Sequence, residues 1–183
     1  MDVNDAVALI GDAVGASATA SPAVWADLGA GTGTFTRALM RVLDPASTIY
    51  AVDHDASSVG ALRALAAKSA TRVVPVKADF AHGLELPGLG ASLLDGILLA
   101  NSLHFVRDAG RVLTQLTRHV RVGGRVVVVE YDRRAPSRWV PYPIDAARWP
   151  RLAESAGLSE AVVTATLPSV YAGMLYAGVA TRR

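Results

Sequence analysis

The stretch of sequence that decides the fold is ADLGAGTG, residues 26–33. An apolar run precedes its three closely spaced glycines, and a segment with apolar residues at helical spacing follows them. Because glycine has no Cβ atom, such a turn can adopt strained backbone angles and admit a ligand close to the main chain. A strand, glycine turn and helix in this order predict the place where an open α/β sheet binds nucleotide-like ligands, outside the carboxyl ends of its strands.

The spacing of the glycines and two nearby carboxylates indicate the kind of ligand. A dinucleotide fingerprint has the pattern GxGxxG, whereas here the third glycine is Gly33 and Thr34 follows it. Asp27 ends the apolar run two residues before the first glycine, where its charge would repel a pyrophosphate. It suits a ligand with positive charge at this end. Asp53 ends the next apolar run, where a carboxylate accepts hydrogen bonds from ribose hydroxyls.

Along the rest of the chain, apolar runs alternate with segments of helical period, which is typical of βαβ units with helices on both faces of a parallel sheet. Helices are expected over residues 3–14, 34–43, 56–68, 109–120 and 145–156. Strands are expected over residues 23–28, 48–53, 72–76, 93–100, 125–129, 161–166 and 174–180. Asp55 or Ser57 would cap the third helix. Prolines and glycines predict loops over residues 82–90 and 133–143.

Composition excludes several classes of protein. The 183 residues, of which 51% are apolar, suffice for one domain with its own core, and we expect residues 1–183 to form it. The absence of cysteine excludes disulfides, cysteine-ligated zinc and a thiolate nucleophile. The four histidines are scattered, so no metal site is expected. No apolar run reaches the roughly 20 residues of a membrane span, and the N-terminus is acidic, so a cytoplasmic location away from the membrane is expected.

Charge is divided unequally along the chain. Residues 1–106 carry six Lys or Arg against ten Asp or Glu, and residues 107–183 carry twelve against six. A basic second half favours an acidic small molecule or RNA as the partner. The charge pattern alone leaves both open.

These residues resemble the class I S-adenosylmethionine-dependent methyltransferases over about residues 22–183. Residues 27–33 are similar to the motif that wraps the methionine portion of the cofactor in that family. Asp53 matches the acidic residue that holds the ribose. The sequence ADF, residues 78–80, resembles the motif whose aspartate accepts from the adenine amino group. The resemblance therefore implies that the chain is an enzyme that uses S-adenosylmethionine.

The second half of the chain extends the resemblance. Residues 94–101 are similar to the motif that closes the pocket beneath the sulfonium. Residues 122–125 resemble the glycine turn before strand five, with Val122 where the family often has proline. The C-terminal segment is similar to the hairpin that closes the family's sheet. The implied fold is a three-layer, doubly wound Rossmann-like α/β sheet of about seven strands, mostly parallel, with an antiparallel last strand.

The resemblance assigns residues to the cofactor and leaves the catalytic groups as candidates. The residues expected around the cofactor are Asp27, Gly29, Ala30, Gly31, Gly33, Asp53, His54, Asp79, Phe80 and Asn101. Asn101 could also orient the acceptor, and His104 could act as a general base near neutral pH. Tyr142 and Tyr131 are further candidates if the acceptor must lose a proton. The alternative for His104 is that it only packs the cofactor pocket.

The segment 133–143 carries arginines among aromatic residues and is expected above the active site, on the substrate side. Such a composition suits a planar or anionic substrate, or RNA bases. The alternative is a solvated loop that Trp139 and Tyr142 anchor to the core. Asp95 and Trp149 are expected to be structural, the former as an acceptor for nearby backbone N–H groups.

The predicted activity is methyl transfer to a nucleophilic atom of a small-molecule acceptor. An RNA or protein methyltransferase is one alternative, favoured by the basic half of the chain. A nucleotide-binding oxidoreductase is disfavoured by Asp27 and the glycine spacing, and a non-catalytic methyltransferase-like subunit is a third alternative. Without an inserted lid domain, the site would be exposed or would be covered by the leading helical segment 1–20, the loop 133–143 or a second subunit. A homodimer is therefore one possibility.

Overall fold

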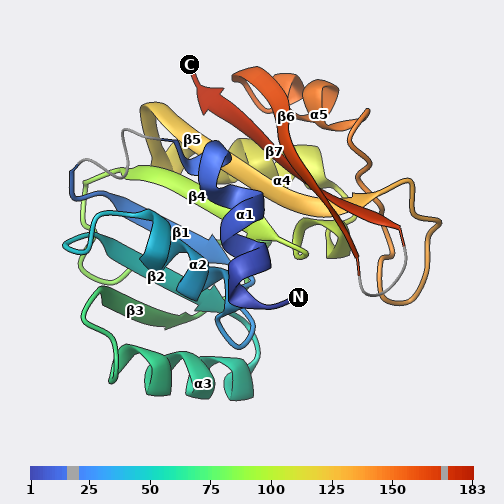
Figure 1. Cartoon of the computed structure of the whole chain (residues 1–183). Helices are drawn as coiled ribbons and strands as arrows, with labels where there is room; N and C mark the ends of the chain where they lie inside the picture. Colours follow the sequence, from blue (N-terminus) through green and yellow to red (C-terminus); the bar gives the residue numbers. More distant parts are fainter. Residues whose placement is uncertain (16–20, 170–172) are drawn as a thin grey trace.

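A computed structural model describes residues 1–15, 21–169 and 173–183, which are built around one seven-stranded sheet (Figure 1). The strands are β1 (Val24–Leu28), β2 (Thr48–Asp53), β3 (Arg72–Lys77), β4 (Leu94–Ala100), β5 (Val120–Asp132), β6 (Leu158–Pro168) and β7 (Met174–Arg182). Their order is β3-β2-β1-β4-β5-β7-β6. Strands β1 to β5 pair in parallel, and β7 runs antiparallel to both of its neighbours. The expected sheet is confirmed.

Helices cover both faces of this sheet (Figure 1). They are α1 (Val3–Val14), α2 (Thr34–Val42), α3 (Ala56–Ala66), α4 (Ala109–Leu116) and α5 (Trp149–Ser155), with short 3-10 helices η2 (Leu103–Phe105) and η3 (Thr117–His119). Buried residues of α1 and α2 pack with Trp25 and Leu98, whereas those of α4 and α5 pack with Ile97 and Leu99 on the opposite face. Because side chains alternate across a strand, the apolar runs of β1 and β4 supply both cores. The structure therefore has the three layers expected.

Local signals place the helix starts. The side chain of Asp55 accepts from the backbone N–H of Ser58 at 2.7 Å and caps α3, and Ser57 Oγ donates to the same carboxylate. Asp2 forms a capping box with Asp5 at the start of α1. Of the two caps that were expected for α3, the structure selects Asp55.

Some boundaries differ from the expected ones. Strand β5 begins at Val120 instead of residue 125, because the segment with Gly123 at φ 74° pairs as an irregular part of the strand. Helix α5 begins at Trp149 instead of residue 145, and Asp145 instead accepts from the backbone N–H of Arg148 at 2.8 Å in the turn before the helix. Residues 16–20 of the expected leading segment lie outside the described residues.

Asp95 and Trp149 have the structural roles that were expected of them. Asp95 accepts from the backbone N–H of Val24 at 2.7 Å and from Nε of Arg121 at 2.7 Å. Trp149 is fully buried against the sheet. Within residues 1–15, 21–169 and 173–183, no helix has the length and apolar character needed to cross a membrane.

Candidate active site

The carboxyl ends of β1, β2 and β4 place the segments that follow them at one edge of the sheet (Figure 1). After β1, the backbone turns through Gly29, Gly31 and Gly33 at φ 81°, 54° and 89°, a region that residues with a Cβ atom rarely adopt. The N–H groups of Gly29 and Ala30 both donate to the carbonyl of Val52 at 2.9 Å. The end of β2 therefore holds the glycine turn in place.

Asp27 is buried at the end of β1, below this turn. Its Oδ2 accepts from Thr36 Oγ1 at 2.7 Å, while its Oδ1 is buried without a hydrogen-bond partner in the part of the chain that the structure describes. Burial raises the pKa of Asp27 from 3.8 to about 7; the charge of Asp53 adds to the rise and the bond from Thr36 opposes it. This oxygen is an acceptor that a hydrogen-bond donor could satisfy.

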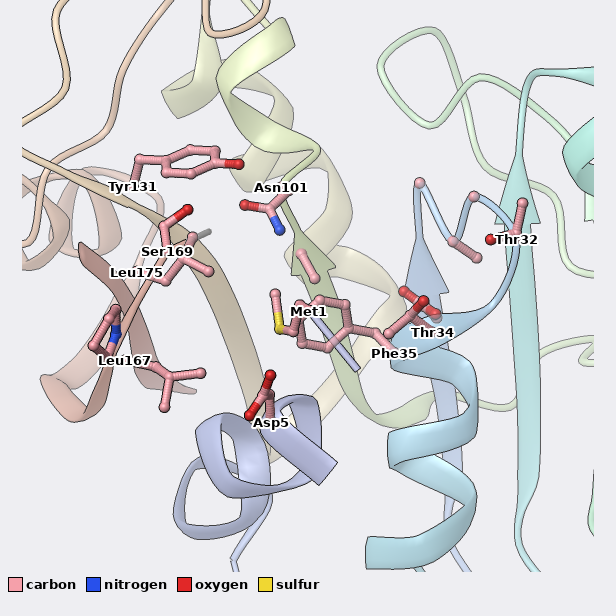
Figure 2. Close-up of a pocket in the computed structure, with 16 residues that line it drawn as sticks. Met1, Asp5, Thr32, Thr34, Phe35, Asn101, Tyr131, Leu167, Ser169 and Leu175 are labelled. Atoms are coloured by element: carbon pink, nitrogen blue, oxygen red, sulfur yellow. The ribbon is translucent and has the colours of Figure 1, made fainter. Parts of the chain in front are cut away.

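A cavity of about 270 Å³ opens beside Asp27 and the glycine turn, and we call it the turn cavity (Figure 2). Asn101 points into it from the end of β4, and Met1 and Phe35 also line it. Asn101 adopts φ 52°, and its backbone N–H donates to Val129 at 2.8 Å. Its Oδ1 is a second buried acceptor without a partner among the described residues. Two residues that line one small cavity therefore each carry a buried oxygen without a partner among the described residues.

A second cavity, of about 450 Å³, adjoins the first at Gly29 and Asn101, and we call it the carboxylate cavity. The ends of β2 and β3 bring Asp53, His54, Asp79 and Phe80 into its wall, as expected of residues that would surround an adenosine. Asp53 holds the wall in shape, because its Oδ2 accepts from the N–H of Gly31 at 2.8 Å and its Oδ1 from that of Asp55 at 2.9 Å. It thus ties the glycine turn to the start of α3.

A third cavity, of about 410 Å³, adjoins the turn cavity at Asn101 and Tyr131, and we call it the aromatic cavity. Its wall contains Asn101, His104, Phe105, Tyr131, Arg134, Trp139 and Val140. The side chains of Phe105 and Trp139 are 56% and 66% exposed. The guanidinium of Arg134 lies 4.6 Å from the ring centre of Tyr131. The wall of this cavity is therefore mostly apolar and aromatic, and it also contains the cationic side chain of Arg134.

The loop 133–143 is not anchored to the core by Trp139 and Tyr142, which was the alternative expected from the sequence. Both side chains are exposed, whereas Val140 within the loop and Ile144 just after it are buried. The backbone N–H of Tyr142 donates to the carbonyl of His104 at 3.0 Å. Anchoring through Val140 leaves the Trp139 ring free to line the aromatic cavity.

His104 is buried beneath this cavity and paired with a residue that the sequence analysis missed. Its Nδ1 lies 2.5 Å from Oε2 of Glu130, and its backbone N–H donates to Oε1 at 3.1 Å. Burial raises the pKa of the Glu130 carboxyl, and the hydrogen bonds and charge of His104 oppose that rise. The available signal was an acidic residue directly after the four valines 126–129 of a buried strand.

The structure distributes the expected site residues unequally. Asp27, Gly29, Ala30, Gly31 and Asn101 line the turn cavity, and Tyr131 lines both it and the aromatic cavity. Gly33 lies outside the three cavity walls and instead begins α2 as its N-cap. Tyr142 is also absent from the three walls. In the described ranges, no group of three or more His, Asp or Glu side chains could hold a metal ion.

Comparisons with known proteins bear on this geometry. A family model described as a methyltransferase domain matches residues 26–126. No curated protein sequence matches the chain significantly.

Among solved structures, the Burkholderia thailandensis 1,6-didemethyltoxoflavin-N1-methyltransferase, with its substrate and S-adenosylhomocysteine bound, has a TM-score of 0.72 at 21% identity, covering 98% of this chain and 77% of that one. The CcbJ methyltransferase from Streptomyces caelestis has a TM-score of 0.71 at 16% identity, with 99% and 96% covered. A SAM-dependent methyltransferase from Aquifex aeolicus has a TM-score of 0.68 at 17% identity, with 88% and 82% covered. At these identities the likeness is one of fold.

Proposed function

The chain belongs to the methyltransferase domain family, and from that premise we propose that it transfers a methyl group from S-adenosylmethionine to a small-molecule acceptor. The match over residues 26–126 and the shared fold confirm the resemblance that the motifs indicated, and with it the enzyme class and the cofactor. The acceptor and the residues that hold each ligand are our proposals.

The observation that carries the proposal is a pair of buried oxygens without a partner among the described residues, on two residues that line the turn cavity. Oδ1 of Asp27 and Oδ1 of Asn101 are buried acceptors, and leaving such groups without a partner costs about 1–3 kcal/mol each. The ammonium group of a methionine moiety supplies three N–H donors. A cationic end beside Asp27 also removes the cost of its buried charge. The residues therefore fit the methionine end of the cofactor.

The carboxylate cavity fits the other end. Asp53 has a second lone pair on each oxygen and lies in the wall, so it can accept from ribose hydroxyls while keeping its backbone bonds. Asp79, Phe80 and His54 would border the adenine. The bound cofactor supplies an electrophilic methyl group on a sulfonium. The chain's own contribution is to align the acceptor and exclude water, which can be worth up to about 7–11 kcal/mol.

The acceptor would enter through the aromatic cavity, which meets the turn cavity at Asn101 and Tyr131. Its volume of about 410 Å³ falls within the range of small-molecule sites, about 300–1,000 Å³. The loop 133–143 supplies one wall, so we assign it to the acceptor side. Arg138 lies 4.7 Å over the ring of Trp139. The volume of the cavity, not this stacking, favours a small molecule over RNA.

Two measurements test the proposal. Calorimetric titration should show binding of S-adenosylhomocysteine and none of NADH; binding of NADH alone would mean that the chain is an oxidoreductase. Incubation of metabolite, RNA and protein extracts with S-adenosylmethionine labelled in its methyl group should transfer label to the metabolite fraction. Asp12→Asn, an exposed carboxylate on α1, serves as the matched control for Asp27→Asn in both experiments. Label only in RNA or protein would contradict the small-molecule acceptor.

A further inference from the structure

The buried pair of His104 and Glu130 demands a reason beyond stability. Both side chains are almost fully inaccessible to solvent, at 2% and 1% exposed. Removing a carboxylate from water costs several kcal/mol, so burial of this pair is weak evidence of stabilisation. Glu130 engages both the ring Nδ1 and the backbone N–H of His104, which fixes the imidazole in one orientation. Such a fixed imidazole points to a positioned functional group.

The free edge of that imidazole belongs to the aromatic cavity. Nδ1 is engaged by Glu130, while the ring contributes to the cavity wall, so Nε2 is the atom left to meet a molecule in the cavity. A carboxylate on Nδ1 also selects the tautomer in which Nδ1 carries the proton and Nε2 accepts one. The arrangement is that of a base prepared to remove a proton from an acceptor.

The remaining wall of the cavity indicates the shape of the acceptor. Phe105 and Trp139 expose large aromatic surfaces in the same cavity wall as His104 and Tyr131. Aromatic rings stack favourably on flat, apolar partners, and their burial by a ligand removes exposed apolar area from water. Arg134, over the Tyr131 ring, places positive charge near the same space. The cavity therefore suits a planar ring that gains negative charge during the reaction.

We propose that the acceptor is a phenol, that His104 is its general base, and that Glu130 is the positioning residue for His104. This inference rests on the proposed methyl transfer. The phenolic proton passes to Nε2 of His104 while the oxygen's electron pair forms the new O–CH₃ bond. The C–S bond to the sulfonium breaks, and its electron pair stays on sulfur. The products are an aryl methyl ether, a neutral thioether and an imidazolium whose charge faces Glu130.

The need for a base separates this acceptor from others. A carboxylate acceptor is already ionised near neutral pH, with a pKa of about 4, so a buried base would add nothing. A phenol, with a pKa of about 10, must lose its proton as the methyl arrives. Positioned general bases contribute about 10²–10⁴-fold to such steps. The His104–Glu130 pair is therefore matched to a weakly acidic hydroxyl group.

The first test uses matched acceptors: a planar phenol, its methyl ether, and the carboxylic acid and primary amine on the same ring. We expect label transfer to the phenol alone. His104→Gln should lower kcat at least 100-fold for the phenol and less than tenfold for a nitrophenol that is already ionised at the assay pH. His119→Gln, a histidine on η3 outside the three cavity walls, is the matched control and should change neither rate.

The second test examines the role of Glu130, first by a measurement that does not require turnover. In ¹⁵N spectra, the His104 ring of the wild-type chain should show one tautomer with a protonated Nδ1, and Glu130→Gln should produce a mixture. The same variant should lower kcat for the phenol and leave its KM almost unchanged. Its kcat should be restored with the ionised nitrophenol, which keeps the test valid if the variant is less stable. Trp139→Ala should raise KM for the phenol about tenfold and leave kcat within about twofold.

The outcomes separate this inference from the proposed function. Failure of S-adenosylhomocysteine to bind the wild-type chain would overturn both. Cofactor binding with label transfer to the amine or the carboxylic acid, at a rate unaffected by His104→Gln, would overturn the phenol and the base while the methyltransferase proposal stands. An equal loss in His104→Gln with the phenol and with the ionised nitrophenol would assign His104 a packing role only.

Discussion

Ser102 packs against Gly29 so closely that a Cβ atom at position 29 would lie 2.5 Å from the Cβ of Ser102. The Oγ of Ser102 donates to the carbonyl of Leu28 at 2.7 Å, which holds the serine in this position. The segment after β4 therefore rests directly on the backbone of the glycine turn. Gly29 lines both the turn cavity and the carboxylate cavity, so this contact bears on both parts of the proposed cofactor site.

Gly29→Ala should disrupt this contact. Alanine adds a Cβ atom where Ser102 lies and is strained at φ 81°, so we expect a loss of about 2–4 kcal/mol in the free energy of unfolding and at least tenfold weaker binding of S-adenosylhomocysteine. Denaturant unfolding and calorimetry measure both. Gly60→Ala is the control, because it lies within α3 with nothing within 4 Å of the added Cβ, and it should be neutral or slightly stabilising. A neutral Gly29→Ala would contradict the packing.

Asp27→Asn should increase stability in a pH-dependent manner and weaken cofactor binding. Because folding raises the pKa of Asp27 from 3.8 to about 7, the carboxyl favours the folded state most below pH 4, and that contribution is lost as the pH rises to 7. Asparagine does not ionise, so the variant does not lose stability in this way as the pH rises. We therefore expect it to stabilise the chain by about 2–3 kcal/mol more at pH 8 than at pH 5. Thermal unfolding at the two pH values measures the difference, and Asp12→Asn should show none.

Asp53→Asn should remove discrimination at the ribose. We expect the wild-type chain to bind S-adenosylhomocysteine at least tenfold more tightly than its 2′-deoxy analogue, and the variant to bind the two alike. Calorimetry with both ligands measures the difference. Asp79→Asn, at the other end of the carboxylate cavity, should weaken both ligands equally and keep the discrimination. If Asp53→Asn retains the full preference for the ribose, another residue holds the hydroxyls.

Asp95→Ala should affect stability without affecting cofactor binding. The substitution removes the acceptor of the Val24 N–H and the partner of Arg121, so we expect a loss of about 1–2 kcal/mol in the free energy of unfolding. The affinity for S-adenosylhomocysteine should stay within twofold, because Asp95 is outside all three cavity walls. Glu154→Ala, an exposed acid on α5, should cost less than about 0.5 kcal/mol. A large loss of affinity in Asp95→Ala would contradict its structural role.

Local signals explain why much of the fold could be predicted from the sequence. The glycine turn, the carboxylates that end β1 and β2, and the Asp55 cap are each encoded within a few neighbouring residues. Their placement at one edge of the sheet then follows from the parallel topology, in which strands end at the same side.

Other features depend on contacts between distant residues. Glu130 continues an apolar strand and looks like its end, and its role appears only when β5 pairs beside β4 and brings it to His104, 26 residues away. In the loop 133–143, composition did not indicate that Val140 rather than Trp139 would be buried. Loops pack by whichever side chain meets a gap in the core, and that gap is formed by other segments.

The position of Asn101 in the walls of all three cavities has a thermodynamic consequence. A ligand that moves this side chain in one cavity would alter the neighbouring cavities, so in the proposed site the binding free energies of cofactor and acceptor would be coupled through it. Linkage requires the coupling to be reciprocal: whatever factor the cofactor adds to the acceptor's affinity, the acceptor adds to the cofactor's. Asn101, with its left-handed backbone, is thus the point at which the two affinities would be linked.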